Sequence, residues 1–133
     1  DMLLCLDFKT GQEKWRYESP SEGEPSHPGS RSVPTVDEDA VYFVGSYGSV
    51  HCIDRKTHKA RWSVKMSDRY ADARTPNWGY AQPALVVGDI VFVTPFGSET
   101  GAAGHRATTP SPRSAGADRT DEAAASAGRP ARQ

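Results

Sequence analysis

The sequence predicts an all-β protein that is built from repeated, four-stranded antiparallel sheets. Two observations support this fold class. LLCLDFKTGQEKW at residues 3–15 returns as VHCIDRKTHKARW at residues 50–62, with a spacing of 47 residues. VPTVDEDAVYFVGSYG at residues 33–48 is similar to QPALVVGDIVFVTPFG at residues 82–97, with a spacing of 49 residues. Repeats of about 40 to 50 residues that contain only short β-type runs and turn residues are typical of β-propeller blades.

Eight strands are expected in order along the chain. Each candidate is rich in β-branched or aromatic residues and is bounded by Gly, Asp, Pro or Ser. No segment shows a sustained helical period of 3.6 residues. The expected strands cover residues 3–7, 13–18, 33–36, 40–45, 49–54, 61–66, 83–87 and 90–95.

The connections DFKTGQE and DRKTHKA are predicted to be tight polar turns within the repeat. In each turn an aspartate closes one strand and a threonine hydroxyl can bond back to the turn amides. These residues are Asp7, Thr10, Asp54 and Thr57. Gly11 supplies a positive φ angle at no steric cost. Its counterpart is His58, which is expected to keep the same conformation with some strain.

The strands are expected to form an incomplete propeller with about two blades' worth of strands. Residues 1–18 supply the outer two strands of one blade, residues 33–66 a complete blade, and residues 83–95 the inner two strands of a third. A closed propeller typically needs four to eight blades. Apolar faces and sheet edges should therefore stay uncovered, which makes the isolated chain marginally stable. Because the chain opens within a strand pattern and shows no signal peptide, we interpret it as an internal or truncated piece of a longer protein.

The C-terminal segment, residues 105–133, differs from the rest of the chain. It contains no aromatic residue and no Val, Ile or Leu, so it cannot bury enough apolar surface to offset chain entropy. We therefore expect a partial propeller over residues 1–104 and a disordered tail over residues 105–133. Two explanations stay open: a natural linker after a degenerate blade, or the loss of the reading frame near Gly104. The second is favoured, because strand content stops where the third strand of the repeat is due.

Bulk composition excludes several classes of partner. The chain carries 16 Lys and Arg against 17 Asp and Glu, for a net charge of −1. This balance argues against nucleic acid and against an anionic membrane surface. No apolar run approaches the roughly 18 residues that span a bilayer. The sequence therefore predicts neither nucleic-acid binding nor a membrane span.

The two cysteines and the histidines do not form a recognisable chemical site. Cys5 and Cys52 occupy equivalent positions of successive repeats, which on stacked sheets lie about 10 Å apart, too far for a disulfide. Both are expected to be small buried apolar side chains. The four histidines lack a zinc-type spacing with either cysteine. No nucleophile motif of the G-x-S-x-G kind occurs, and the Gly-rich segments lack the following helix that phosphate binding requires. Neither catalytic nor metal-ligating residues are therefore assigned.

Binding residues are expected on the loops at one end of the sheets. Alternating connections bring the long loops 19–32 and 67–82 to the same end as residues 46–48 and 95–104. The loop 67–82 carries a mixture of aromatic and arginine residues that is typical of recognition surfaces. The candidate binding residues are Arg69, Tyr70, Arg74, Asn77, Trp78 and Tyr80. The favoured alternative is that Trp78 and Tyr80 only anchor the loop onto the sheets.

The repeat LLCLDFKTGQEKW/VHCIDRKTHKARW resembles that of the quinoprotein (PQQ-type) β-propeller family, and WGYAQPALVVGDIVFVTPFG is similar to another stretch of the same family. The resemblance implies that Trp15 and Trp62 pack between adjacent blades, while the aspartates and threonines order the preceding turns. The pattern itself indicates the same, because each Trp alternates with a cationic or polar residue in a short strand and can bury one face. The structural repeat motif comprises Asp7, Thr10, Gly11, Trp15, Asp54, Thr57 and Trp62.

Three functions are compatible with this family resemblance. The first is a non-catalytic binding or assembly scaffold, similar to the propeller lipoprotein of outer-membrane assembly, which implies an extracytoplasmic location. The second is a piece of a quinoprotein dehydrogenase, and the third is a sensor propeller attached to a signalling domain. The dehydrogenases hold PQQ and calcium with a vicinal cysteine pair, a tryptophan and a set of Glu, Asn and Asp residues. This sequence has no adjacent cysteines and no position that matches the calcium ligands. We therefore expect no cofactor for this chain, and PQQ and calcium only if the full-length protein is a dehydrogenase. The expected partners are the other blades of a parent propeller and further proteins.

Overall fold

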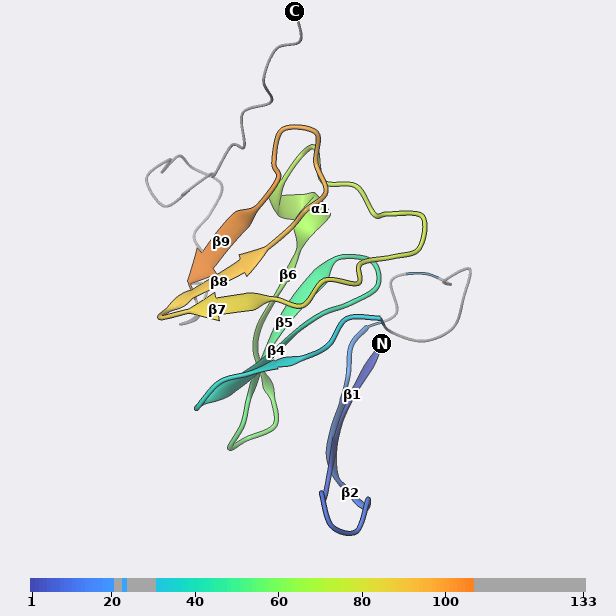
Figure 1. Cartoon of the computed structure of the whole chain (residues 1–133), viewed down its shortest axis with the longest axis vertical. Helices are drawn as coiled ribbons and strands as arrows, with labels where there is room; N and C mark the ends of the chain where they lie inside the picture. The colour runs from blue at the N-terminus through green and yellow to red at the C-terminus, as the bar shows by residue number, and fades with distance from the viewer. Residues whose placement is uncertain (21–22, 24–30, 107–133) are drawn as a thin grey trace, which may run out of the picture.

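The computed structural model describes residues 1–20, 23 and 31–106, and it places them in three antiparallel sheets (Figure 1). The first sheet pairs β1 (Met2–Leu6) with β2 (Glu13–Glu18). The central sheet has the order β3 (Thr35–Val36), β4 (Ala40–Val44), β5 (Ser49–Asp54) and β6 (Ala60–Lys65). The third sheet has the order β7 (Leu85–Val87), β8 (Ile90–Val93) and β9 (Ala103–Arg106).

The observed fold confirms the predicted class. All eight predicted strands are present, with ends that differ from the expected ones by at most two residues. The central sheet is the four-stranded meander that was expected within residues 33–66. A single turn of helix, α1 (Met66–Arg69), follows β6. In the described part of the chain no helix is long and apolar enough to span a membrane.

The third sheet corrects the prediction for the C-terminal segment. His105 and Arg106, which the sequence analysis assigned to a disordered tail, form the end of β9. This strand is invisible to side-chain patterns because AGHR contains no β-branched or aromatic residue. It is held by backbone pairing with β8, in the register Val93 to Ala103 and Ile90 to Arg106. The remainder of the predicted tail, residues 107–133, lies outside the described residues.

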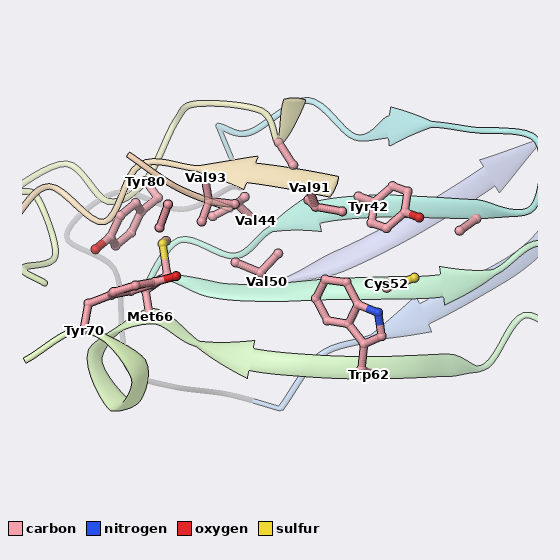
Figure 2. Packing of buried hydrophobic residues seen from close by; sticks show 13 residues of the cluster. Tyr42, Val44, Val50, Cys52, Trp62, Met66, Tyr70, Tyr80, Val91 and Val93 are labelled. Carbon is pink, nitrogen blue, oxygen red and sulfur yellow. The ribbon is translucent and has the colours of Figure 1, made fainter. Parts of the chain in front are cut away.

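The three sheets pack face to face through two apolar clusters. The sheets are stacked in the order first, central, third. In each sheet, we call the side that points in the direction from the third sheet to the first the rear face, and the opposite side the forward face. On the rear face of the central sheet, Val41, Phe43 and Ile53 pack with Leu3 of β1. The forward face packs onto the third sheet, as Figure 2 shows. That cluster includes Tyr42, Val44, Val50, Cys52, Trp62, Val91 and Val93.

Strand pairing places the second repeat one residue away from the alignment made on sequence. In the central sheet the β3–β4 hairpin closes with the Asp37 amide donating to the Ala40 carbonyl at 2.9 Å, and the β7–β8 hairpin closes at the pair Val87–Ile90. Matching the two hairpins gives a spacing of 50 residues instead of 49. Side-chain burial supports the spacing of 50 residues. Val91 is then equivalent to Val41, and both valines are buried on the rear faces of their sheets. The sequence alignment followed a shared phenylalanine, and a shift of one residue turns a strand side chain to the other face.

The two repeat tryptophans occupy equivalent positions on forward faces. Trp15 pairs across the strands with Cys5, and Trp62 pairs with Cys52. Trp62 is 5% exposed and lies 6.2 Å from the Tyr42 ring between ring centres. Trp15 is half-buried and joins the cluster between the first and central sheets. Both cysteines are free thiols on different sheets, as their spacing predicts.

We expect Trp62→Ala to lower the free energy of unfolding by about 3 to 5 kcal/mol, the range for emptying a large buried aromatic site. The exposed turn variant Lys59→Ala should stay within about 0.5 kcal/mol of the unchanged protein. Denaturant unfolding curves of both variants give the comparison. Equal losses would contradict the placement of Trp62 between two sheets.

Candidate binding surface at the loop end of the sheets

The loop between α1 and β7 is anchored by Tyr80. The side chain is only 3% exposed, and its hydroxyl lies 2.9 Å from the Pro95 carbonyl oxygen and 3.0 Å from that of Arg74. The backbone amide of Tyr80 donates to the Ser46 carbonyl at 3.0 Å. Burial raises the pKa of Tyr80, so the hydroxyl keeps the proton that it donates. Tyr80 therefore joins three connections at one end of the sheets.

Asp72 provides a second anchor for the same loop. Its carboxylate accepts hydrogen bonds from the amides of Glu99 and Thr100, both at 2.9 Å, and from the Thr100 hydroxyl at 2.8 Å. These donors, the Thr100 amide first, hold the pKa of Asp72 below its ordinary value. Gly97 is required beside it, because a side chain there would collide with the carboxylate. The loop is therefore fixed to the β8–β9 connection through both Tyr80 and Asp72.

Two of the predicted binding residues belong to the core. Tyr70 is 6% exposed, and its hydroxyl lies 3.0 Å from Nε2 of His105 in β9. Tyr80 is buried as described above, so the anchoring alternative applies to it. Both tyrosine rings carry a large apolar area and a hydroxyl that has a hydrogen-bond partner in the structure, which suits them to the core. Neither ring can contact a ligand from solution.

Trp78 differs from the two tyrosines. Its side chain is 61% exposed, so it is not buried in the core as Tyr80 is. The guanidinium carbon of Arg31 lies 5.6 Å from the centre of the Trp78 ring, within the range of a cation–π contact. Arg69, Arg74 and Asn77 are also exposed. The structure thus brings an aromatic and several cationic side chains to the solvent side of a fixed loop.

Phe96 is a further surface residue that sequence reasoning missed. It is 48% exposed, and its ring meets the Tyr80 ring edge-on at 5.7 Å between centres. Its φ angle is +58°, which is unusual for a bulky side chain. Strained backbone of this kind occurs preferentially at functional sites. Its position beside Gly97 in the Gly-rich segment is the only signal that the sequence offered.

Part of the loop 19–32 joins the same end of the sheets. The Ser32 hydroxyl donates to the Gln82 carbonyl at 3.2 Å, and Gly23 lies against the Tyr47 ring. Residues 21–22 and 24–30 lie outside the described part of the chain. Asp68 and Glu99 are exposed acidic residues at this end. We use the term loop face for the exposed aromatic, arginine and asparagine side chains here. It comprises Arg31, Arg69, Arg74, Asn77, Trp78 and Phe96.

The two repeat turns connect β1 to β2 and β5 to β6. They lie at the end of the sheets opposite the loop face, and each is held by its aspartate. Asp54 accepts hydrogen bonds from the amides of Lys56 and Thr57 at 2.8 Å, and its other oxygen pairs with Arg61 at 2.9 and 2.7 Å. The Thr57 amide first, and then Arg61, hold the pKa of Asp54 well below its ordinary value. The φ angle of His58 is +59°, which confirms the expected conformation.

The first copy of the turn repeats this arrangement with weaker charge pairing. Asp7 accepts from the amides of Lys9 and Thr10 at 3.0 Å, and Lys14 lies 3.1 Å from its second oxygen. Gly11 has a φ angle of +70°, at the position that His58 takes in the second copy. The His58 ring stacks on Trp15 at 4.8 Å, so the second turn also helps to place the tryptophan of the first repeat.

Comparison with protein families agrees with this geometry. The model of the family described as outer membrane protein assembly factor BamB, a PQQ-type repeat family, matches residues 1–132. The chain belongs to this family. No curated protein matches it. Membership in the BamB-like family confirms the resemblance that the repeat motif carries.

A calcium-bound quinone of the dehydrogenase type would require a group of metal ligands and a vicinal cysteine pair in this BamB-like chain. Over residues 1–20, 23 and 31–106, no three His, Cys, Asp or Glu side chains are grouped so that they could hold a metal ion. Cys5 and Cys52 lie on different sheets and cannot form the vicinal pair of the dehydrogenases. No reaction step is therefore assigned to a bound quinone.

We expect Asp54→Asn to lower the free energy of unfolding at pH 7. The variant should also lose less of this free energy than the unchanged protein when the pH falls below about 4. Because the folded-state pKa of Asp54 lies below the unfolded value, the carboxylate stabilises the fold above about pH 4 and loses this effect as the pH falls further. Urea unfolding at pH 7 and pH 3 measures both effects. The exposed Glu38→Gln is the matched control. An acid dependence that Asp54→Asn leaves unchanged would contradict the assigned role.

Proposed function

We propose that this chain is a non-catalytic β-propeller repeat module that binds a protein partner through the loop face, as a binding or assembly scaffold. The exposure of Trp78 on an immobilised loop is the observation that carries this proposal. Tyr80 and Asp72 fix that loop, so little conformational entropy would be lost when a partner binds. The family description, an outer-membrane assembly factor, supports a role in assembly.

The chemistry of the loop face favours a particular kind of partner. Trp and Arg are the residue types that most often dominate the energy of protein–protein contacts. Three arginines of the loop face, Arg31, Arg69 and Arg74, are exposed, Arg31 lies beside the Trp78 ring, and a guanidinium pairs best with a carboxylate. We therefore propose a partner that offers an apolar side chain to Trp78 and acidic residues to the arginines. We also propose an extracytoplasmic location, on the basis of the family description.

Site-specific photo-crosslinking tests the loop face directly. A photoreactive benzoylphenylalanine replaces Trp78 in one variant and the exposed turn residue Lys59 in a control, and both are illuminated in a bacterial envelope extract. We expect protein adducts from position 78 that disappear when Arg74→Glu is added, and none from position 59. The same adducts at both positions would overturn the proposal.

We further propose that this chain alone neither binds PQQ tightly nor oxidises alcohols or sugars. An axial cofactor needs side chains from several blades around the ring, in pre-organised positions, whereas the described residues supply three sheets. The test is reconstitution of the chain with PQQ and calcium. Quinone absorbance that stays with the protein, or dye reduction above that of a Trp78→Ala control, would favour the dehydrogenase instead.

A further inference from the structure

The connection between β8 and β9 is longer than the equivalent connection in the central sheet. Residues 45–48 connect β4 to β5, whereas residues 94–102 connect β8 to β9. The connection in the third sheet therefore has nine residues and that in the central sheet has four. Tyr80 bonds to both of them, so both lie at the loop-face end of the sheets. Insertions in single repeats collect in the loops of one face, which is often the binding face.

The β8–β9 connection is fixed at two points by the loop between α1 and β7. At the first point the Arg74 amide donates to the Pro95 carbonyl at 3.2 Å, and the Tyr80 hydroxyl lies 2.9 Å from the same oxygen. The Pro95 side chain is fully buried. At the second point the Asp72 carboxylate accepts hydrogen bonds from the amide and the hydroxyl of Thr100. The backbone between these two points is therefore held in one position.

Phe96 follows the first of these points directly, in a backbone conformation that favours glycine. Its φ angle is +58°, in the left-handed region where the Cβ atom of any other residue crowds the following carbonyl oxygen. In the described part of the chain, His58 is the only other non-glycine residue with a positive φ angle. A residue kept in such a conformation is held there by its surroundings, and positions of this kind cluster at functional sites.

The two strained residues differ in what their rings contact. The His58 ring stacks face-on against the Trp15 ring, with an angle of 12° between the planes. This stack joins the central sheet to the first, so His58 has a structural role. The Phe96 ring meets the Tyr80 ring only edge-on, and 48% of the residue stays exposed. Phe96 therefore presents an apolar surface to solvent from a fixed backbone.

The charged residues along the β8–β9 connection are arranged asymmetrically. Arg74 is exposed, and its amide is bonded to the residue that precedes Phe96. Toward the other end of the connection Glu99 is exposed, and its amide is bonded to the Asp72 carboxylate. Opposite charges attract and like charges repel across an interface. An acidic group of a partner is therefore favoured on the Arg74 side of Phe96 and disfavoured on the Glu99 side.

We propose that the β8–β9 connection determines which protein binds to the loop face, and that Phe96 is its main contact residue. This inference rests on the proposed function of the loop face. The partner is a protein segment that packs an apolar side chain on the exposed side of the Phe96 ring and places a carboxylate beside Arg74. Trp78 supplies a second aromatic contact from the neighbouring loop. A few aromatic and arginine residues of this kind carry most of the binding energy in protein–protein contacts.

Photo-crosslinking from two positions of the full chain tests the contact. Benzoylphenylalanine replaces Phe96 in one variant, Trp78 in a second and the exposed turn residue Lys59 in a control, and each variant is illuminated in a bacterial envelope extract. We expect the same protein adduct from positions 96 and 78, and none from position 59. Mass spectrometry should place the cross-link from position 96 on an apolar side chain, in a peptide that also contains Asp or Glu.

The contribution of the Phe96 ring is then measured with the photoreactive group at position 78. Phe96→Ala and Phe96→Gly both remove the ring, so each should lower the adduct yield by roughly tenfold, the effect of losing one dominant contact. The matched control is Phe8→Ala, the same substitution at an exposed phenylalanine of the β1–β2 turn, which should leave the yield unchanged. In urea unfolding, Phe96→Gly should have a higher midpoint than Phe96→Ala, because glycine adopts a positive φ angle at no steric cost.

The outcomes separate this inference from the proposed function. If position 78 gives an adduct that persists in Phe96→Ala, or if position 96 gives none while position 78 does, the role of the β8–β9 connection is wrong and the proposed function stands. If neither position gives an adduct, both fail. An equal loss of adduct in Phe8→Ala would also contradict the inference. The cross-link from position 96 keeps an aromatic ring there, so it tests the contact even where Phe96→Ala lowers stability.

Discussion

The packing of one repeated sheet on the next is the interaction on which the rest of this structure depends. The strands are short, and a sheet of this size needs a covered face to be stable. Trp62 and Tyr42 cover the third sheet from the forward face of the central sheet, while Phe43 and Ile53 cover the first sheet from its rear face. The central sheet is the only one of the three described sheets that is covered on both sides, so the stability of the other two derives from it.

The fold was predictable because the residues that repeat along the sequence are those that form the turns and the buried faces of the sheets. The aspartate and the positive-φ position of each turn, and the tryptophan that follows, indicate both the strand ends and the buried face. The register of the third sheet could not be predicted in this way, because Phe43 and Phe92 are identical residues on opposite faces. The strand β9 was missed because its backbone pairing requires no particular side chain, and Gly104 carries none.

The candidate site could be predicted only as a region. The sequence indicated the loop 67–82, and Arg74 and Trp78 are exposed there. It could not separate them from Tyr70 and Tyr80, because an aromatic ring suits a recognition surface and a buried anchor equally well. That distinction depends on the hydrogen-bond acceptors near each hydroxyl, such as the Pro95 carbonyl. Pro95 lies in the β8–β9 connection, and the partner of the Tyr70 hydroxyl, His105, lies in β9, so their arrangement follows from the packing of the sheets.

Residue-resolved amide hydrogen exchange under native conditions tests the central claim most directly. Amides that open only with global unfolding mark the most stable part of a protein. If the doubly covered central sheet stabilises its neighbours, the amides of β4 and β5 should exchange most slowly in the whole chain, and those of β9 far faster. Protection in β9 equal to that in β5, or β4 and β5 amides that exchange as fast as those of the exposed turn at residues 55–59, would contradict this account.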